Sequence, residues 1–460
     1  MKQRPYRRHP SKLSERLQEL ADSLLAPLVS SFRLAELFWE EIRRSIVDFK
    51  DDCPSSVRQE WLRGAQIRAV GESSAATSWT TDLSAQGLAK AFRNLGVELK
   101  PPRVSSWPED NPLRIISSAD LLSWREAAAE LVARLRSVLP NAPQLEGHFS
   151  CEEYVRGSAS GLGAGRERRG QRILMRIDAV RKDGTRLRRA RLFEGKVAPE
   201  ALLDSSLLED LRMAWDDDPR KVGGLAGSMP VVVASGQGSG LFHELVGHSL
   251  EADYVLSGVS PFSGCAYGQK VTSSELTIKD SPNPALGCGG ISLDDEGQLP
   301  KAITLVDSGL VAGLIHDRVT ALMAGTTPTG NGRREDFRIE AAPRMRNIVV
   351  SAGPHSPDAL LSGIRRGLYA ERLAGGRADL AQGHFTLVVE SGRRIEQGRL
   401  REPLRDVLIR GEVLQTLSDI EGVANDWRVS PEPMFCGKRG VVITGIAGPT
   451  VRLGLMEVVS

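Results

Sequence analysis

Two histidines and a glutamate lie within one hexapeptide near the middle of the chain. His243 is followed at once by Glu244, and His248 comes five residues after His243. Only seven histidines occur in 460 residues, so this pair is unevenly placed. Neutral imidazoles bind zinc, and a carboxylate beside the metal can take a proton from metal-bound water. The segment therefore predicts a hydrolytic zinc site with Glu244 as its general base.

The third ligand of such a site must come from elsewhere, and Cys436 is the best candidate. It lies in Met-Phe-Cys-Gly-Lys-Arg-Gly, a glycine-flanked turn with adjacent cations. Nearby positive charge, and above all a metal, favours the thiolate. Three protein ligands would leave a fourth position open, as in catalytic zinc sites.

The spacing of the two histidines sets a condition on the helix that carries them. Residues i and i+5 are separated by about 140° around an ideal α-helix, so their rings could not share one ion. Either the two are not co-ligands, or a π-type turn absorbs the extra residue. Gly247, just before His248, makes such a distortion plausible. The alternative is a buried amphipathic helix with two incidental histidines.

Other polar residues could support this chemistry. Glu251 follows His248 by three residues and could hold the second imidazole nitrogen, or be an ordinary surface carboxylate. Arg333 and Arg334 follow a Gly-Asn-Gly turn that contains Asn331. This set could contact a peptide carboxylate or a developing oxyanion, or the arginines could pair with neighbouring acidic residues.

Composition is that of an ordinary soluble protein, with 41% hydrophobic and 26% charged residues and a net charge of +2. No apolar stretch approaches the length of a membrane span, and no apolar signal core follows the basic start, so we expect neither a membrane partner nor secretion. The five cysteines are scattered and odd in number, which favours a reducing cytoplasm over a disulfide framework.

Hydrophobic periodicity predicts two regions that differ in secondary structure. We expect helices over 13–28, 84–95, 119–139 and 198–215, strands over 34–50 and 62–70, a loop over 100–112 and a hairpin over 172–193 that turns at 182–185. After an acidic, proline-containing stretch at 216–219, glycines become frequent. Short apolar runs then alternate with turns at 229–234, 303–306, 347–351, 385–390 and 441–446, interrupted by helices at 240–252 and 411–423.

These patterns predict an α+β fold rather than a doubly wound sheet, because strands and helices do not alternate regularly. We expect an N-terminal mixed α/β sheet domain over 1–222. A mainly β domain that carries the metal-binding helix should follow over 223–460.

One basic segment needs an explanation. Between Arg156 and Arg191, eleven arginines and one lysine stand against three acidic residues. Such a patch could bind nucleic acid. The preferred interpretation is a solvated hairpin face with a loose glycine-rich entry, its charge balanced by acidic residues such as Asp216 to Asp218.

The second half of the chain resembles the TldD/PmbA family of metalloproteases, in particular its catalytic TldD-like branch. The match to that branch rests on the His-Glu-x-x-x-His motif. Further matching stretches are, in order, 229–233, Glu251 with Asp253, 262–264, Asp294-Asp295-Glu296-Gly297, 327–335, Pro343-Arg344-Met345, Asn425-Asp426, Cys436-Gly437-Lys438 and 448–450. Phe337 stands where a tyrosine is expected.

The resemblance implies a zinc-dependent peptidase that acts on unfolded or flexible peptides inside a chamber between subunits. The dimer would be a homodimer or a heterodimer with a PmbA-like subunit. By the same resemblance, His243, His248 and Cys436 would bind zinc and Glu244 would be the base. Two alternatives stay open: a catalytically silent peptide-binding or regulatory subunit, and a nucleic-acid-associated regulator that uses the basic segment.

Overall fold

A computed structural model describes residues 25, 28, 32–51, 53–72, 75–95, 118–161, 163–182, 184, 186–195, 205–216, 225–405 and 407–459. Most of the helix expected over 13–28, the loop over 100–112 and the boundary between 222 and 223 lie outside these residues. No helix in the described part of the chain is long and apolar enough to cross a membrane.

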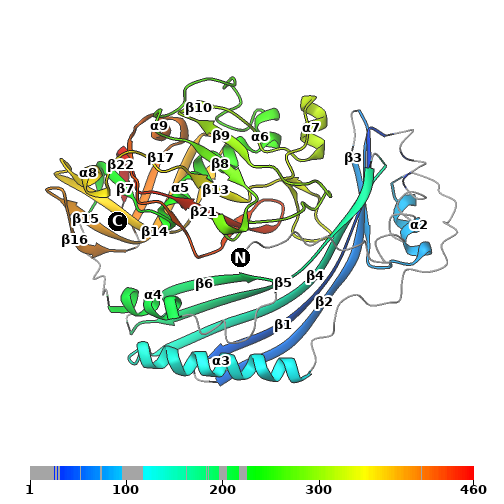
Figure 1. Ribbon diagram of the computed structural model, residues 1–460, viewed down its shortest axis with the longest axis horizontal. Helices are drawn as coiled ribbons and strands as arrows, with labels where there is room; N and C mark the ends of the chain where they lie inside the picture. The colour runs from blue at the N-terminus through cyan, green and yellow to red at the C-terminus, as the bar shows by residue number, and fades with distance from the viewer. Residues whose placement is uncertain are drawn as a thin grey trace, which may run out of the picture.

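The N-terminal part is built on one long, bent sheet (Figure 1). Six described strands pair antiparallel in the order β3-β2-β1-β4-β5-β6. Their bounds are β1 Leu34–Lys50, β2 Cys53–Val70, β3 Ala75–Thr80, β4 Gln144–Ser160, β5 Gly163–Val180 and β6 Arg186–Glu194. The expected strand over 62–70 is thus the second half of a longer one.

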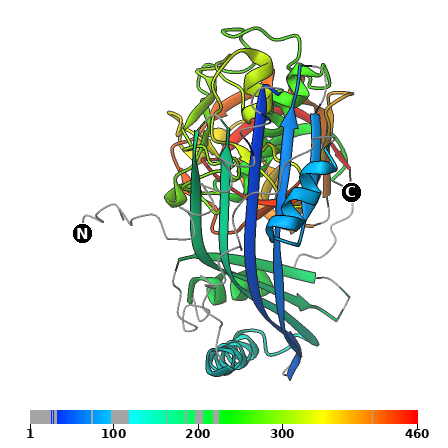
Figure 2. The same cartoon turned by 90° about the vertical axis from the view of Figure 1, so that its right-hand side faces the viewer.

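Helices cover one face of this sheet. They are α2 (Ala85–Arg93), α3 (Ser118–Val138) and α4 (Ser205–Asp216). Figure 1 shows α3 along the lower side of the strands and the C-terminal half of the chain on the other side. Figure 2 shows α3 end-on and α2 against the outer side of the strands. The helix expected over 198–215 begins at Ser205 among the described residues.

Strand periodicity sorts the side chains between the two faces. Successive residues of a strand point to opposite sides. On β5, the odd-numbered residues from Ile173 to Ala179 are buried in a hydrophobic cluster with α3 and α4. The even-numbered residues between them, which include Arg176 and Asp178, therefore face the C-terminal half. The sheet is apolar under its helices and charged on the side that meets the rest of the molecule.

The C-terminal half is mainly β. One sheet has the order β14-β7-β22-β17-β15-β16, and it closes on itself because β14 also pairs with β15. A second has the order β10-β9-β8-β13-β21-β19, with β20 paired to β21. Their bounds are β7 Gly227–Val233, β8 Ile278–Ser281, β9 Ile303–Asp307, β10 Leu310–Val311, β13 Asn347–Val350, β14 Arg366–Asp379, β15 His384–Glu396, β16 Arg399–Leu404, β17 Val407–Glu412, β19 Arg428–Val429, β20 Met434–Gly437, β21 Val441–Gly448 and β22 Val451–Val459.

Short elements complete this half. They are β11 Gly332–Arg333, β12 Ala342–Pro343, β18 Ile420–Val423, and the helices α5 Gly240–Phe242, α6 Ala252–Leu256, α7 Arg318–Ala324, α8 Pro357–Leu361 and α9 Val413–Ser418. The expected α+β class is confirmed. The helix expected over 411–423 is present only as α9, and the rest of that range belongs to β17 and β18, which flank it.

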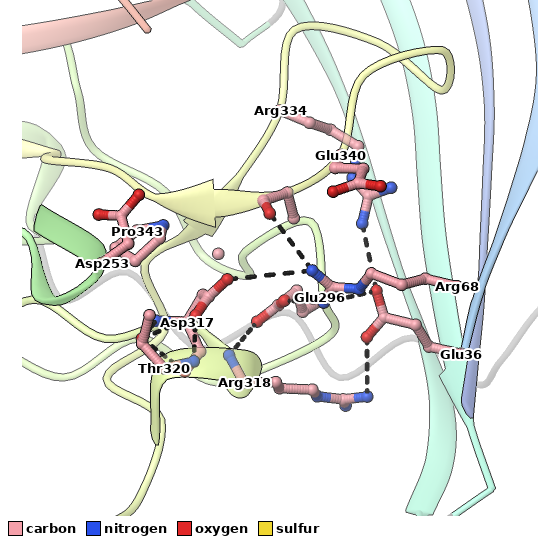
Figure 3. A network of polar contacts seen from close by, with 12 residues as sticks. Glu36, Arg68, Asp253, Glu296, Asp317, Arg318, Thr320, Arg334, Glu340 and Pro343 are labelled. Carbon is pink, nitrogen blue, oxygen red and sulfur yellow. Dashed lines mark hydrogen bonds and ion pairs between the residues drawn. The ribbon is translucent and has the colours of Figure 1, made fainter. Parts of the chain in front are cut away.

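A buried network of charges joins the two halves (Figure 3). Glu36 on β1 lies 2.8 Å from Arg68 on β2, 3.6 Å from Arg318 and 3.4 Å from Arg334. Arg68 also contacts the carboxylate of Glu296. Burial alone would raise the pKa of Glu36, but the arginines around it lower that pKa. Glu296 of the acidic motif at 294–296 therefore pairs with the N-terminal sheet and is not exposed to solvent.

Part of the basic segment belongs to the same network of buried charges between the two halves, which we call the joint. Arg156 lies 3.0 Å from Glu40 and 3.4 Å from Asp295, and Arg168 lies 2.6 Å from Asp295. The interpretation of this segment as a solvated face is therefore wrong for Arg156 and Arg168, whereas Arg176, Arg186 and Arg188 are exposed as expected. Gly157 lies in β4, and Gly163 and Gly165 lie in β5, so most of the glycine-rich start is paired strand. Arg156 and Arg168 compensate buried carboxylates.

Candidate metal centre

The segment that carries both histidines changes its helix type within a few residues. After α5, a π-helix covers His243–Gly247, and a 3-10 turn covers His248–Leu250. The amide of His248 donates to the carbonyl of His243, a bond between residues i and i+5. The predicted π-type turn is confirmed, whereas the regular helix expected over 240–252 is wrong. The wider turn brings the two imidazoles to one side, with ring centroids 5.0 Å apart.

Gly247 matters at this turn because its missing side chain leaves room for a neighbour, and not because its backbone conformation is unusual. Its φ of −57° is an ordinary helical value. A Cβ atom built there would lie 1.8 Å from Sδ of Met345. Met345 is fully buried in the core of the C-terminal half, so the glycine lets this side chain pack directly beneath the π-turn.

His243, His248 and Cys436 converge on one point. One donor atom from each lies within 4.8 Å of the others. Nε2 of His248 is 3.3 Å from Sγ of Cys436. His243 is buried, and its Nδ1 has no hydrogen-bond partner among the residues that the structure describes. Two imidazoles and a thiolate are the donor types of catalytic zinc sites, so the residues present fit this metal.

The position of Cys436 is fixed by its strand and by a buried arginine. Cys436 lies on β20, opposite Val442 of β21. Arg344, which is 1% exposed, donates to the backbone carbonyl of Cys436 and, at 2.7 Å, to that of Lys438. The guanidinium therefore holds the backbone at Cys436 and Lys438, on both sides of Gly437.

Behind His248 lies a second layer of charged side chains. Oε2 of Glu251 is 3.2 Å from Nδ1 of His248. The ammonium of Lys438 donates to Glu251 at 2.9 Å and to Asp253 at 2.7 Å, and lies 4.1 Å from the ring centroid of Tyr254. A carboxylate on the outer nitrogen of a ligating imidazole fixes its tautomer and orientation.

The protonation preferences of these groups follow from their contacts. Burial opposes the thiolate of Cys436, but the two imidazoles outweigh it and hold the pKa of this thiol well below its usual range. Burial likewise opposes ionisation of Glu251, but Lys438 and His248 lower its pKa to about 2. The cluster thus stabilises a negatively charged sulfur and a charged carboxylate behind the imidazole.

Glu244 and the three candidate ligands line one cavity of about 820 Å³. The lining also includes arginines from β5 and β6 of the N-terminal sheet, residues of β14 and the segment that leads into β20. This volume is in the range of small-molecule and peptide subsites. Both halves of the chain therefore contribute to the space above the candidate metal ligands.

The structure does not bring Asn331, Arg333 or Arg334 to this cluster. Asn331 donates to Asp280 and to the carbonyl of Arg344. Arg333 donates to backbone carbonyls at Met345 and Ile443. Arg334 contacts Gln66 and Glu36 of the N-terminal sheet and stacks 4.2 Å above Phe38. These are the contacts of buried structural side chains, and none of the three lines the cavity at Glu244.

Sequence reasoning assigned no role to Lys438, Arg344 or Met345, although all three lie in motifs that carried the resemblance. The structure places each of them one contact away from a candidate ligand or from the turn that presents it. A signal was present in Cys-Gly-Lys, since a lysine that is buried beside a thiol needs an acidic partner.

Comparison with known proteins supplies the family. The model of the PmbA/TldA metallopeptidase C-terminal domain matches residues 226–460, just over half of the chain. The chain belongs to the TldD/PmbA metallopeptidase family. The resemblance seen in the sequence is thereby confirmed.

Relatives in this family carry protease names. The chain is 32% identical over 229 residues to a protein of Haemophilus influenzae named a metalloprotease TldD homolog, covering 50% of this chain and 47% of that protein. It is 31% identical over 237 residues to a zinc metalloprotease TldD homolog of Saccharolobus solfataricus, covering 51% and 52%. The matches thus span about half the length of these relatives.

Similarity of fold extends further than similarity of sequence. The crystal structure of TldE from Thermococcus kodakarensis matches with a TM-score of 0.71 at 18% identity, over 97% of this chain and 100% of that one. The N-terminal sheet is therefore included in this likeness of fold, even though the sequence matches concentrate in the C-terminal half.

Proposed function

We propose that this protein is a zinc-dependent peptidase that hydrolyses unfolded or flexible peptides. The observation that carries the proposal is the convergence of His243, His248 and Cys436 with Glu244 on one cavity. The protease names of the TldD relatives support the reaction class. When bound, zinc at such a site acts as a Lewis acid that makes water a better nucleophile.

The chain's own residues would divide the remaining work. His243, His248 and Cys436 would hold the metal, and Glu251 would orient His248 through Nδ1. Glu244 directly follows His243 and lines the cavity beside the ligands. There it would take a proton from the attacking water and pass it to the leaving amine, as a general base and then a general acid.

A dimer and a peptide-sized chamber belong to the same proposal. The fold similarity to a protein named TldE supports pairing with a PmbA-like subunit, and a homodimer is the alternative. We place the reaction in a reducing cytoplasm, because Cys53, Cys151, Cys265, Cys288 and Cys436 are all free thiols in the structure. A chamber between subunits would admit extended chains and exclude folded domains.

The alternative is a peptide-binding subunit that keeps the motif without the reaction. The Glu244→Gln variant separates the two, since glutamine keeps the shape of the side chain but cannot accept the proton. We expect this variant to retain zinc and to lose cleavage of a flexible peptide by a factor on the order of 10²–10⁴.

Glu390→Gln is the matched control, because Glu390 lines the same cavity but is held 2.6 Å from Arg372 rather than beside the ligands. It should cleave within a few-fold of the unchanged protein. Cleavage by Glu244→Gln at the rate of that control would reject Glu244 as the base. Absence of cleavage by the unchanged protein, alone and with a PmbA-like subunit, would favour the silent subunit.

A further inference from the structure

The part of the basic segment that does not enter the joint lies against the candidate active site. Arg176 on β5 and Arg186 and Arg188 on β6 line the same cavity as His243 and Glu244. Arg188 stands opposite Asp178 in the β5–β6 ladder, and Arg186 stands opposite Val180. Strand periodicity therefore puts all three arginines on the face that meets the C-terminal half.

These guanidinium groups are accessible from the cavity. Their side chains are 44%, 51% and 59% exposed for Arg176, Arg186 and Arg188 respectively. By contrast, Arg156, which belongs to the joint, has a side chain that is only 9% exposed. An exposed cation can meet a ligand without first losing a buried partner.

Among the described residues, acidic neighbours compensate the charge of these three arginines, the basic wall of the cavity, only in part. Arg188 lies 2.7 Å and Arg176 lies 3.7 Å from the carboxylate of Asp178, so two cations share one anion. Arg186 lies 3.1 Å from Glu146, whose own side chain is 34% exposed. Surface pairs of this kind are weak and exchange readily with solvent or ligand.

The other charged residues that line the cavity do not cancel the wall. Glu390 and Glu432 both contact Arg372, which lies between them. Arg377 on β14 adds a further exposed cation. The remaining carboxylate of the lining is Glu244 beside the candidate ligands. The cavity thus has five arginines and three glutamates among its described lining residues, with the excess of positive charge on the side of the N-terminal sheet.

We propose that Arg176, Arg186 and Arg188 form an acidic-peptide subsite, which selects substrates with Asp or Glu residues near the bond to be cleaved. The proposal rests on the peptidase function proposed above and adds a side-chain preference to it. An extended peptide places alternate side chains on one side, so two or three carboxylates on a strand can face these arginines together. Substrates rich in Lys or Arg would be repelled by the same wall.

The test measures binding rather than cleavage, so that it stands apart from the reaction. Full-length Glu244→Gln protein is titrated with three fluorescent, unstructured peptides of equal length, which carry Asp, Asn or Lys at the same positions. At low salt, the Asp peptide should bind roughly tenfold more tightly than the Asn peptide, and the Lys peptide should bind most weakly. The preference should shrink at high salt, because exposed charges are screened.

Two triple variants assign the preference to the wall. In Arg176→Gln/Arg186→Gln/Arg188→Gln, affinities for the Asp and Asn peptides should agree within about twofold, while the Asn peptide binds as before. The control Arg399→Gln/Arg401→Gln/Arg410→Gln removes the same charge from exposed arginines outside the cavity and should keep the preference.

Equal binding of the Asp and Asn peptides to the parent protein, or a preference that survives in the cavity variant, would overturn the proposal. Should the triple cavity variant not fold, Arg188→Gln alone should reduce the preference by about twofold. If no peptide is cleaved by the unchanged protein but the Asp preference depends on the wall, the subsite stands and the peptidase function fails. Cleavage without any preference would leave the peptidase function standing and reject the subsite.

Discussion

Loss of the charge on Glu36 is predicted to loosen the joint between the two halves of the chain. Glu36→Gln changes one oxygen to an amide and keeps the shape of the side chain. In the structure, Glu36 is 1% exposed and lies within 2.8–3.6 Å of Arg68, Arg318 and Arg334. Without this carboxylate, Arg334 would keep the side-chain oxygen of Gln66 as a neutral partner.

The expected loss of folding stability follows because the buried arginines would lose one anionic partner. Removal of one partner from a buried ion pair typically costs about 3–5 kcal/mol. Glu60→Gln on β2 is the control, because Glu60 pairs with Arg58 at 3.3 Å, both side chains are more than 40% exposed, and the pair lies outside the joint. Its cost should be below about 1 kcal/mol. Folded proteins have roughly 5–15 kcal/mol to lose, so the difference is measurable.

The pH dependence gives the prediction a sign. The arginines lower the pKa of Glu36 in the folded protein below its ordinary value of 4.5. A lowered folded-state pKa stabilises the fold above the unfolded pKa, and that stabilisation is lost as the pH falls through the folded pKa. The stability difference between the unchanged protein and Glu36→Gln should therefore be full at pH 7 and shrink in strong acid.

Urea unfolding of the metal-free proteins, followed by tryptophan fluorescence, measures this difference without a contribution from bound metal. Glu36→Gln should unfold at a clearly lower urea concentration than Glu60→Gln at pH 7. Indistinguishable midpoints for the two variants would refute the reasoning that the joint depends on a charged Glu36.

Three further predictions concern the site. Gly247→Ala should weaken zinc binding at least tenfold, because the added Cβ would lie 1.8 Å from Sδ of Met345. Competition with a chelator measures this affinity, and Met345→Ala in the same chain should recover part of the loss. Lys438→Met should lower zinc affinity by about 10–100-fold, because Glu251 loses the ammonium 2.9 Å away that holds it against His248. A shift of less than twofold would show that Lys438 and Glu251 do not support the metal ligands. Finally, one substrate should be cleaved when unfolded and resist when a ligand stabilises its folded state; equal rates for both forms, with the protease unaffected by the ligand, would contradict a chamber that admits only extended chains.

Sequence reasoning reached the metal cluster because few residue types bind zinc. Two histidines at i and i+5 could share an ion only across a π-turn, so ligand chemistry predicted a local backbone feature that is present in the structure. Part of the N-terminal sheet was also predictable. The strand expected over 34–50 is β1, and on β5 the alternation from Ile173 to Ala179 follows burial, whereas β4 was not predicted. The sequence pattern could not show which part of the molecule packs against the charged face of the N-terminal sheet.

The arginines illustrate this limit. Arg333 and Arg334 follow a Gly-Asn-Gly turn, and that local sequence is the same whether the guanidinium groups face a ligand or distant protein oxygens. Their partners lie at Ile443 and Glu36, more than one hundred residues away along the chain, and only the tertiary fold brings them together. Arg176, by contrast, was noted only as one of the cations of the basic segment. Its place beside the candidate active site follows from the register of β5 and β6.

The missed strand near the C-terminus has a different cause. Val413, Leu417 and Ile420 are spaced by four and three residues, which is a helical pattern. Val413 and Leu417 do belong to α9, but Ile420 pairs with Leu453 of β22 as part of a strand. Pairing with a distant strand overrides the local periodicity there.

Zinc K-edge X-ray absorption of the purified protein tests the candidate site most directly. Binding by His243, His248 and Cys436 predicts one sulfur at about 2.3 Å and two imidazole nitrogens at about 2.0 Å from the metal. In Cys436→Ser protein, the sulfur shell should disappear and the zinc content should fall. A zinc spectrum without a sulfur neighbour, or one unchanged in Cys436→Ser, would contradict the site described here.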